Sequence, residues 1–182
     1  MPFMNREPNY TKFNIGTGTY GTPEIKFANS GHNLTIGNYC SIANNVKIML
    51  GGEHRIDWIS TYPFTKTIVS AKQKTGHPRS KGDVVIGNDV WIGYNTLIMS
   101  GVKIGNGAVI AANSTVVKDI PDYAIYGGNP ARFIKWRFKE ELIIKLNNIK
   151  WWEWSEKKIE DNIDLILSTN IEEFINKFEN GN

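Results

Sequence analysis

The sequence predicts an all-β fold: a parallel β-helix with an inserted loop and a C-terminal α-helical tail. Three observations support this fold. An aliphatic residue recurs at every sixth position, the phase of that repeat breaks once, and helical spacing replaces the repeat near the C-terminus. The chain has 182 residues, 41% of them hydrophobic, which is enough for one domain with a core, or for one domain and an appendage.

The repeat is clearest in six consecutive hexads, which begin at Ile86, Ile92, Ile98, Ile104, Ile110 and Val116. A period of six is neither the helical period nor simple alternation, so it predicts one short strand and one turn per hexad. We expect the aliphatic first position to fill the interior, and Gly, Asn and Asp at the second to fourth positions to form the turns; the fifth position is small or β-branched throughout. Three hexads would close one triangular coil. The pattern is typical of hexapeptide-repeat, left-handed β-helix proteins.

An earlier block carries the same signature at Ile36, Ile42 and Ile48, with fainter starts at Ile15 and Gly21. The interval from Ile36 to Ile86 is 50 residues, which is not a multiple of six. An insertion is therefore predicted at about 49–84. We assign residues 1–130 to the β-helix domain with this insertion.

Residues 131–182 are predicted to form a C-terminal helical extension. Phe138, Leu142, Leu146 and Ile149 are spaced for one face of a helix. Ser155 is a candidate cap for a second helix that carries Ile159, Ile163 and Ile166, and Asn170 with Glu173 suggests a third helix start. The tryptophans of 151–154 are expected to anchor this tail by packing.

Charge and composition argue against several classes of partner. The net charge is +3, and the 21 basic and 18 acidic residues are spread along the chain, so nucleic acid is not an expected partner. The N-terminus lacks an apolar signal-peptide core, and no stretch approaches the roughly 18 apolar residues of a membrane span. The single cysteine, Cys40, holds the fifth position of a hexad and is expected to be a small core residue.

The histidines His32, His54 and His77 are the candidate chemical residues. His54 lies early in the predicted insertion, and a loop that leaves a β-helix covers a neighbouring face or subunit, where functional residues gather. Imidazole titrates near neutral pH, so His54 is the preferred general base. His77 lies in the same insertion and is the second candidate, whereas His32 is expected to be structural.

Two other kinds of site are set aside. The intervals between the histidines are 22 and 23 residues, without a close pair on one strand, so no metal site is expected. Gly16, Gly18 and Gly21 match the spacing of a dinucleotide-binding loop. Pro23 and a strand-like stretch follow them instead of a helix, so these are read as turn glycines.

Four stretches together resemble the xenobiotic acetyltransferases, the hexapeptide-type chloramphenicol and streptogramin acetyltransferases: 34–42, 52–64, 86–93 and 126–131. The resemblance covers about residues 34–170, and its most specific part is 52–64, with His54-Arg55-Ile56-Asp57 and Tyr62-Pro63-Phe64. It implies acetyl-CoA as co-substrate, no permanently bound cofactor, and a homotrimer with active sites between subunits. The family's catalytic histidine falls on His54. The cytoplasm, where acetyl-CoA is found, is the expected location.

The resemblance also implies a set of CoA contacts. The pantetheine arm would lie near Trp91, Tyr94 and Ala112, and the CoA phosphates near Val117, Lys118, Arg132 and Lys135. Lysine and arginine at an exposed edge suit a phosphate-bearing ligand. Glu53, Asp57 and Trp58 are candidates for the acceptor side or for orienting His54, and a backbone carbonyl is a further candidate for the orienting role.

The acceptor expected from the sequence is a sugar or a surface-polysaccharide precursor. The stretch between Ile15 and Leu34 is shorter and less aromatic than the one that helps enclose the acceptor in antibiotic-modifying members, which suits a saccharide hydroxyl. An amine could use the same base. The alternative is an antibiotic-inactivating O-acetyltransferase acting on chloramphenicol or streptogramin A, and the third hypothesis is a non-catalytic β-helix scaffold. We expect direct transfer in a ternary complex, with His54 as base and backbone N–H groups stabilising the oxyanion.

Overall fold

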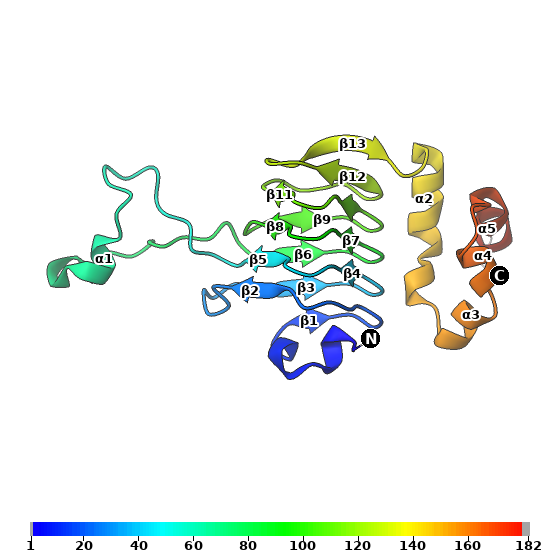
Figure 1. Ribbon diagram of the computed structural model, residues 1–182, viewed down its shortest axis with the longest axis horizontal. Helices are drawn as coiled ribbons and strands as arrows, with labels where there is room; N and C mark the ends of the chain where they lie inside the picture. Colours follow the sequence, from blue (N-terminus) through cyan, green and yellow to red (C-terminus); the bar gives the residue numbers. More distant parts are fainter. Residues whose placement is uncertain (1, 180–182) are drawn as a thin grey trace.

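The computed structural model describes residues 2–179, in which short strands stack into a three-sided parallel coil, the prism (Figure 1). Face 1 consists of β1 (Asn14–Ile15), β3 (Leu34–Ile36), β6 (Val84–Ile86) and β9 (Lys103–Ile104). Face 2 consists of β4 (Ser41–Ile42), β7 (Trp91–Ile92), β10 (Val109–Ile110), β12 (Ala124–Gly127) and β13 (Arg132–Trp136). Face 3 consists of β2 (Glu24–Lys26), β5 (Lys47–Met49), β8 (Leu97–Ile98) and β11 (Thr115–Val116).

The hexad spacing sets the register of these strands. Ile86 lies opposite Ile104, and Ile92 lies opposite Ile110, so three hexads make one turn of the coil. The first-position residues from Ile36 to Val116 are at most 2% exposed, and the fifth-position residues from Cys40 to Ile120 are at most 3% exposed. The burial of the first positions confirms the predicted interior, and the fifth positions are buried with them. Burial of each aliphatic side chain stabilises the fold by about 1.5–3 kcal/mol.

Polar residues make the corners of the prism. Asn95 and Asn113 adopt positive φ values of 57° and 60°, a region that a short polar side chain tolerates better than a β-branched one. The Asn95 Nδ2 group donates to Asn113 Oδ1 at 2.9 Å, so successive corners are bonded to each other. The turn role predicted for these residues is confirmed.

Residues 50–83 leave the prism after β5 on face 3 and return at β6 on face 1; we call this segment the arm (Figure 1). It contains only α1 (Phe64–Thr67) and the 3-10 helix η3 (Val69–Ala71). The backbones of Glu53 and Arg79 pair where the arm leaves the prism, with N–H···O distances of 3.1 and 2.8 Å. Ile56 and Ile59 on the arm are almost fully exposed in the single chain.

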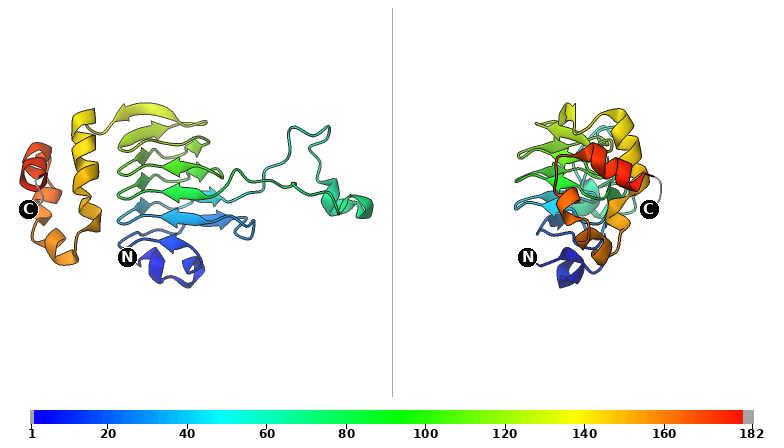
Figure 2. Two further views of the ribbon diagram at one scale, coloured as in Figure 1. Left: turned by 180° about the vertical axis from the view of Figure 1, so that it is seen from behind. Right: turned by 90° about the vertical axis from the view of Figure 1, so that its right-hand side faces the viewer.

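The helical tail lies on the opposite side of the prism from the arm (Figure 1, Figure 2). Its helices are α2 (Glu140–Ile149), α3 (Glu156–Glu160), α4 (Ile163–Ile166) and α5 (Ile171–Phe178), with the 3-10 helix η4 (Trp151–Glu153) after α2. The N-terminal 3-10 helices η1 (Met4–Arg6) and η2 (Pro8–Tyr10) lie next to β1, at the end of the prism opposite β13. None of the helices within residues 2–179 is long and apolar enough to cross a membrane.

Two features of residues 131–182 differ from the sequence prediction. The segment begins with a strand, β13, which pairs antiparallel with β12, before its first helix starts at Glu140. The structure has two helices, α3 and α4, where the sequence predicted a single second helix. Asn162 lies between them with φ −124°, and its side chain donates to Lys158 O at 2.8 Å. The division between residues 130 and 131 itself stays a prediction.

The predicted caps and the packing of the tryptophans are confirmed. The Ser155 side chain accepts from the Lys158 N–H, and the Asn170 side chain accepts from the Glu173 N–H, both at 3.2 Å. Trp152 is 2% exposed in a second core with residues of α2, α5 and the prism. The tail is therefore anchored to the prism by apolar burial.

Candidate functional site

The imidazole of His54 is held by one main-chain hydrogen bond on the arm. Its Nδ1 atom lies 2.7 Å from the carbonyl oxygen of Thr61. Because a carbonyl can only accept, Nδ1 carries the proton and Nε2 keeps a free lone pair. The side chain is exposed in the single chain. This is the tautomer that a general base needs at Nε2.

The second arm histidine packs directly against the first. The rings of His54 and His77 meet edge to face, with centroids 4.8 Å apart and planes at 78°. His77 is only 8% exposed, and its Nδ1 atom accepts from the Arg55 N–H at 3.4 Å. Burial lowers the pKa of His77, and the neighbouring His54, Arg55 and Lys66 lower it further. His77 is therefore mostly enclosed, and its surroundings disfavour a second proton on the ring.

The two acidic candidates near His54 have other partners. Glu53 Oε1 accepts from the Ser100 hydroxyl at 2.8 Å, and Asp57 Oδ1 accepts from Arg55 Nε at 2.7 Å. The hydrogen bond from Arg55 lowers the pKa of Asp57 to about 2. Among residues 2–179, the Thr61 carbonyl, and neither carboxylate, is bonded to the His54 ring. The group that contacts the His54 ring by a hydrogen bond is thus a main-chain carbonyl, and the orienting role of Glu53 or Asp57 stays a prediction.

Trp58 lies against the histidine pair. Its ring stacks on His77 with centroids 5.8 Å apart and planes at 28°. The Arg55 guanidinium lies over the Trp58 ring, 5.3 Å from its centroid. His54, Arg55 and Trp58 therefore cluster around His77, although much of the arm is exposed.

A cavity of about 710 Å³ opens at the base of the arm. Phe27, Asn29, Ser30 and His32 line it from the turn between β2 and β3, and Pro78, Arg79 and Ser80 line it from the returning limb of the arm. Gly51 and Gly52 also line it, so the cavity lies next to the chain that carries His54. The volume is within the range of about 300–1,000 Å³ that is usual for small-molecule sites.

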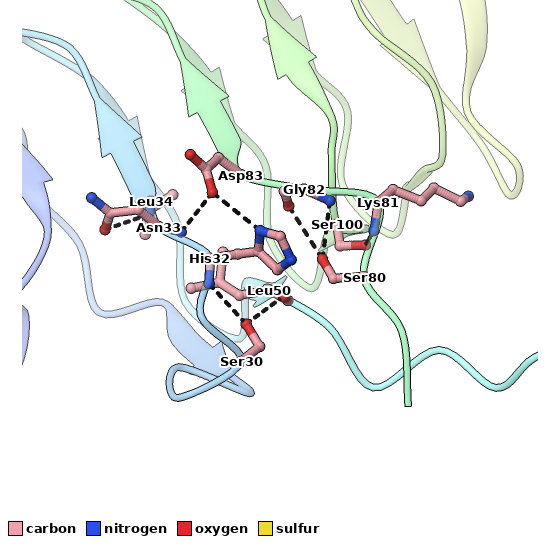
Figure 3. A network of polar contacts seen from close by, with 10 residues as sticks. All are labelled: Ser30, His32, Asn33, Leu34, Leu50, Ser80, Lys81, Gly82, Asp83 and Ser100. Carbon is pink, nitrogen blue, oxygen red and sulfur yellow. Dashed lines mark hydrogen bonds and ion pairs between the residues drawn. The ribbon is translucent and has the colours of Figure 1, made fainter. Parts of the chain in front are cut away.

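Part of the cavity wall, formed by Ser30, His32 and Ser80, belongs to a network of polar contacts (Figure 3). His32 Nδ1 lies 3.4 Å from Asp83 Oδ1, and the same carboxylate oxygen accepts from the Asn33 N–H at 2.8 Å. The Ser30 hydroxyl donates to the Leu50 carbonyl at 2.7 Å, which joins the β2–β3 turn to the first residue of the arm. His32 therefore ties the turn to the prism, as expected for a structural histidine, while it also faces the cavity.

The residues assigned to CoA by resemblance are spread over two faces. Trp91 on β7 is 56% exposed and Tyr94 is 51% exposed, and the Asn45 Nδ2 group donates to the Tyr94 hydroxyl at 2.7 Å. Ala112 lies at the corner one coil above Tyr94 and is exposed. Arg132 and Lys135 project from β13 at the end of the same face 2. Val117 and Lys118 follow β11 on face 3.

Within one chain, the candidate base and the candidate CoA surface lie on different sides of the prism. The arm runs between face 3 and face 1, whereas Trp91 lies on face 2. No single subunit therefore presents His54 over Trp91. The two sets would meet only if the arm of one subunit reached the face of another.

Other sequence expectations concern Cys40 and metal binding. Cys40 is fully buried, and its Sγ atom lies 3.1 Å from the Gly87 carbonyl oxygen, so it is a core residue. Within residues 2–179 no three His, Cys, Asp or Glu side chains gather in a metal-ligating cluster.

Arg55 and Arg79 were not singled out from the sequence, although Arg55 belongs to the specific 52–64 stretch. The Thr61 carbonyl could not be identified, because main-chain acceptors have no sequence signature.

Comparisons with known proteins agree on the class of protein. Residues 83–118 match the family model described as bacterial transferase hexapeptide (six repeats). The chain is 49% identical to a probable macrolide acetyltransferase of Lysinibacillus sphaericus, over 87% of this chain and 91% of that protein. It is 43% identical to a chloramphenicol acetyltransferase of Klebsiella aerogenes, over 76% of this chain and 68% of that protein. Among solved structures, a galactoside acetyltransferase in complex with coenzyme A matches with a TM-score of 0.51 and 28% identity, over 69% of this chain and 60% of that one.

Proposed function

This chain belongs to the hexapeptide-repeat xenobiotic acetyltransferase family, and on that premise we propose that it transfers an acetyl group from acetyl-CoA to a hydroxyl group of an antibiotic. It is an acetyltransferase, and acetyl-CoA is its co-substrate rather than a permanently bound cofactor. The observation that carries the choice of acceptor is the 49% identity to a probable macrolide acetyltransferase over 91% of that protein.

The antibiotic acceptor replaces the saccharide that the short segment before Leu34 suggested. The macrolide-type relative matches this chain over nearly the full length of both proteins, so a chain of comparable length bears an antibiotic-modifying name. A short N-terminal segment therefore does not argue against an antibiotic. The cavity of about 710 Å³ at the arm base is large enough for a drug-sized acceptor, and its wall is formed by the β2–β3 turn and the arm.

In the proposed reaction, His54 is the general base. Its Nε2 atom takes the proton of the acceptor hydroxyl while the hydroxyl oxygen attacks the thioester carbonyl carbon. The tetrahedral intermediate then collapses, the carbon–sulfur bond breaks, and the imidazolium returns the proton to the leaving CoA sulfur. The hydrogen bond from Nδ1 to Thr61 O keeps Nε2 free for both transfers and favours the imidazolium that forms between them.

The proposal places each active site between two subunits of a homotrimer whose coils are left-handed, as the family resemblance implies. Its support within the chain is the separation of the arm from Trp91 and the exposure of Ile56 and Ile59 on the arm. Apolar side chains that are 78% and 110% exposed in one chain would be covered by a neighbouring prism. The cytoplasm, as the source of acetyl-CoA, stays the expected location.

Acetyl-CoA would lie along face 2, with its pantetheine arm near Trp91, Tyr94 and Ala112. The side chains of Arg132 and Lys135 at the end of the same face, and Lys118 after β11, would bind its phosphates, with Val117 beside them. Exposed aromatic rings and exposed cations in this order suit a ligand with an apolar arm and an anionic end.

The experiment is an acceptor screen that measures release of the CoA thiol. A macrolide, chloramphenicol and a group A streptogramin are compared with a galactoside and a nucleotide sugar, using the wild type and His54→Ala with every acceptor. We expect at least one antibiotic to exceed every sugar by about 100-fold in kcat/KM, with the turnover lost in His54→Ala.

A saccharide acceptor is the second candidate. It is favoured by the fold shared with the galactoside acetyltransferase and by the polar cavity wall that contains Asn29, Ser30 and Ser80. Efficient acetylation of a sugar, with every antibiotic inert, would replace the antibiotic proposal by this one. The amino-bearing form of the same sugar would show whether an amine is also accepted.

A further inference from the structure

The contacts around His54 form a continuous series across the arm. The Asp57 carboxylate binds the Arg55 guanidinium, which lies over the Trp58 ring. Trp58 stacks on His77, and the His77 ring contacts the His54 ring edge to face. Each of these groups lies within eight residues of the arm's start or at its return limb. The series ends at the proposed base.

Within this series, His77 is the enclosed member. It is 8% exposed, whereas His54 is open to solvent in the single chain. Its Nδ1 atom accepts a main-chain N–H, which places its proton on Nε2, and Nε2 makes no hydrogen bond within residues 2–179. A second proton on this ring would displace the Arg55 N–H from Nδ1 and add a charge beside Arg55, Lys66 and His54.

One hydrogen bond does not fix an imidazole. The bond from His54 Nδ1 to Thr61 O defines a direction, but the ring can still rotate about that direction and swing Nε2 away from the acceptor. The edge-to-face contact with His77, at 4.8 Å and 78°, supplies the second constraint. Displacement of a catalytic group by about 1 Å can cost on the order of 100-fold in rate.

We propose that His77 is a positioning residue for the acetyl transfer, whose enclosed ring holds the His54 imidazole in its productive orientation without itself accepting the substrate proton. The inference rests on the proposed role of His54. It assigns the second arm histidine a function other than that of an alternative base. It also gives the Asp57–Arg55–Trp58 series a purpose, which is to hold His77 in place.

Charge repulsion during the reaction favours a His77 ring that stays uncharged. His54 becomes an imidazolium during the reaction, and a charged neighbour 4.8 Å away would oppose that step. The groups that face His77 are His54, Arg55 and Lys66, and burial together with these groups lowers its pKa. Near neutral pH, His77 therefore offers His54 a flat aromatic contact without competing for the proton.

The test compares His77→Phe with His77→Ala. Phenylalanine keeps an aromatic ring at this position but has no titratable nitrogen, whereas alanine removes the ring. We expect His77→Phe to keep kcat within about fivefold of the wild type, and His77→Ala to lose about 10- to 100-fold in kcat. Acetyl-CoA affinity by calorimetry should be unchanged in both, because the proposed CoA residues lie on face 2 and beyond β11.

Two kinetic outcomes would overturn the proposal. If His77→Ala turns over at the wild-type rate, the ring contact is not needed. If His77→Phe is as slow as His54→Ala, a nitrogen of His77 takes part in proton transfer. The pH–rate profile gives a further readout, because His77→Phe should keep the acidic limb of the wild type, and loss of that limb would make His77 the base.

A measurement on the unmodified protein avoids any dependence on how the variants fold. Nitrogen-15 NMR of the histidine side chains should show His77 as a neutral ring protonated at Nε2 at pH 7.5. A protonated His77 at pH 7 would contradict the assignment. Failure of the proposed base role of His54 is distinguishable, because it would appear as full activity in His54→Ala, whatever the His77 variants do; failure of the antibiotic proposal would appear as inert antibiotics in the acceptor screen.

Discussion

The Nδ1 atom of His54 donates a hydrogen bond to the main-chain carbonyl oxygen of Thr61 at 2.7 Å. This bond joins the His54 side chain to the main chain seven residues later, so the hydrogen-bond partner of the ring is not an acidic side chain. A carbonyl oxygen cannot take the proton from Nδ1, so it fixes the tautomer at every pH at which His54 is neutral. The carboxylates of Glu53 and Asp57 have other hydrogen-bond partners.

Glu53→Gln should therefore have little effect on catalysis. Glu53 Oε1 accepts from Ser100 at 2.8 Å, and a glutamine oxygen can accept in the same way. We expect kcat within about threefold of the wild type, against the 10²–10⁴-fold loss that is usual when a general base is removed. Steady-state kinetics beside His54→Ala as the reference decide this. A loss approaching that of His54→Ala would return a catalytic role to the carboxylate.

Trp91→Ala should weaken acetyl-CoA binding. The side chain is 56% exposed on face 2, so its removal exposes little core but takes away a large contact surface for the pantetheine arm. Calorimetry should show Kd raised by about 10-fold or more. Val85→Ala is the matched control, since Val85 holds the same hexad position on face 1 and is 37% exposed. Equal effects of the two substitutions would remove face 2 from the CoA site.

The Cys40 thiol should be unreactive in the folded protein. Burial is the largest cause of a rise in the pKa of Cys40 from 9.0 to about 11. At pH 8 only about one thiol in a thousand would be ionised. A disulfide reagent should modify the native protein far more slowly than the urea-unfolded protein. Rapid stoichiometric labelling of the native protein would show that Cys40 is accessible.

The raised pKa of Cys40 also makes the free energy of unfolding depend on pH. The folded-state pKa of Cys40 lies above the ordinary value, so its contribution is fully present below pH 9.0 and is lost as the pH rises through about 11. Cys40→Ala should therefore show a smaller loss of stability than the wild type between pH 8 and pH 11, measured by urea unfolding. Identical pH dependence in the two proteins would contradict the raised pKa.

Ile98→Ala should destabilise the fold strongly. Ile98 is fully buried at the first position of a hexad on face 3, and its loss leaves a cavity in the stacked core. We expect about 2–5 kcal/mol in urea unfolding at a fixed protein concentration. Ile144→Ala on α2 is the control, because Ile144 is 57% exposed and should cost about 0.5 kcal/mol or less. Similar losses would mean that the hexad core does not carry the stability.

The prism could be predicted from the sequence because the residues of each hexad alone indicate where its strand and its turn lie. The aliphatic residues from Ile36 to Val116 repeat in phase with the coil, and the single break in phase places the arm. The split between α3 and α4 could not be predicted. Ile159, Ile163 and Ile166 keep helical spacing across it, and the break coincides with a side-chain bond from Asn162 to Lys158 O, which the apolar spacing does not reveal.

The site was only partly predictable, for a similar reason. His54 could be identified from its place in the arm, but the roles of its neighbours depend on contacts between segments. His77 is 23 residues away in sequence and meets His54 only because the limbs of the arm pair at Glu53 and Arg79. The basic residues at 118, 132 and 135 were assigned by resemblance, and their part in CoA binding stays a proposal.

Complementation between two inactive variants tests the proposed shared site most directly. Each of the variants His54→Ala and Trp91→Glu is expressed and purified alone, the two are also co-expressed at equal levels and purified together, and thiol release from acetyl-CoA is measured with the best acceptor. If the arm of one subunit serves face 2 of the next, each parent is inactive and random mixing restores about a quarter of the wild-type activity. If both parents are inactive and the mixture stays inactive, His54 and Trp91 do not meet across a subunit boundary, and the shared site is wrong.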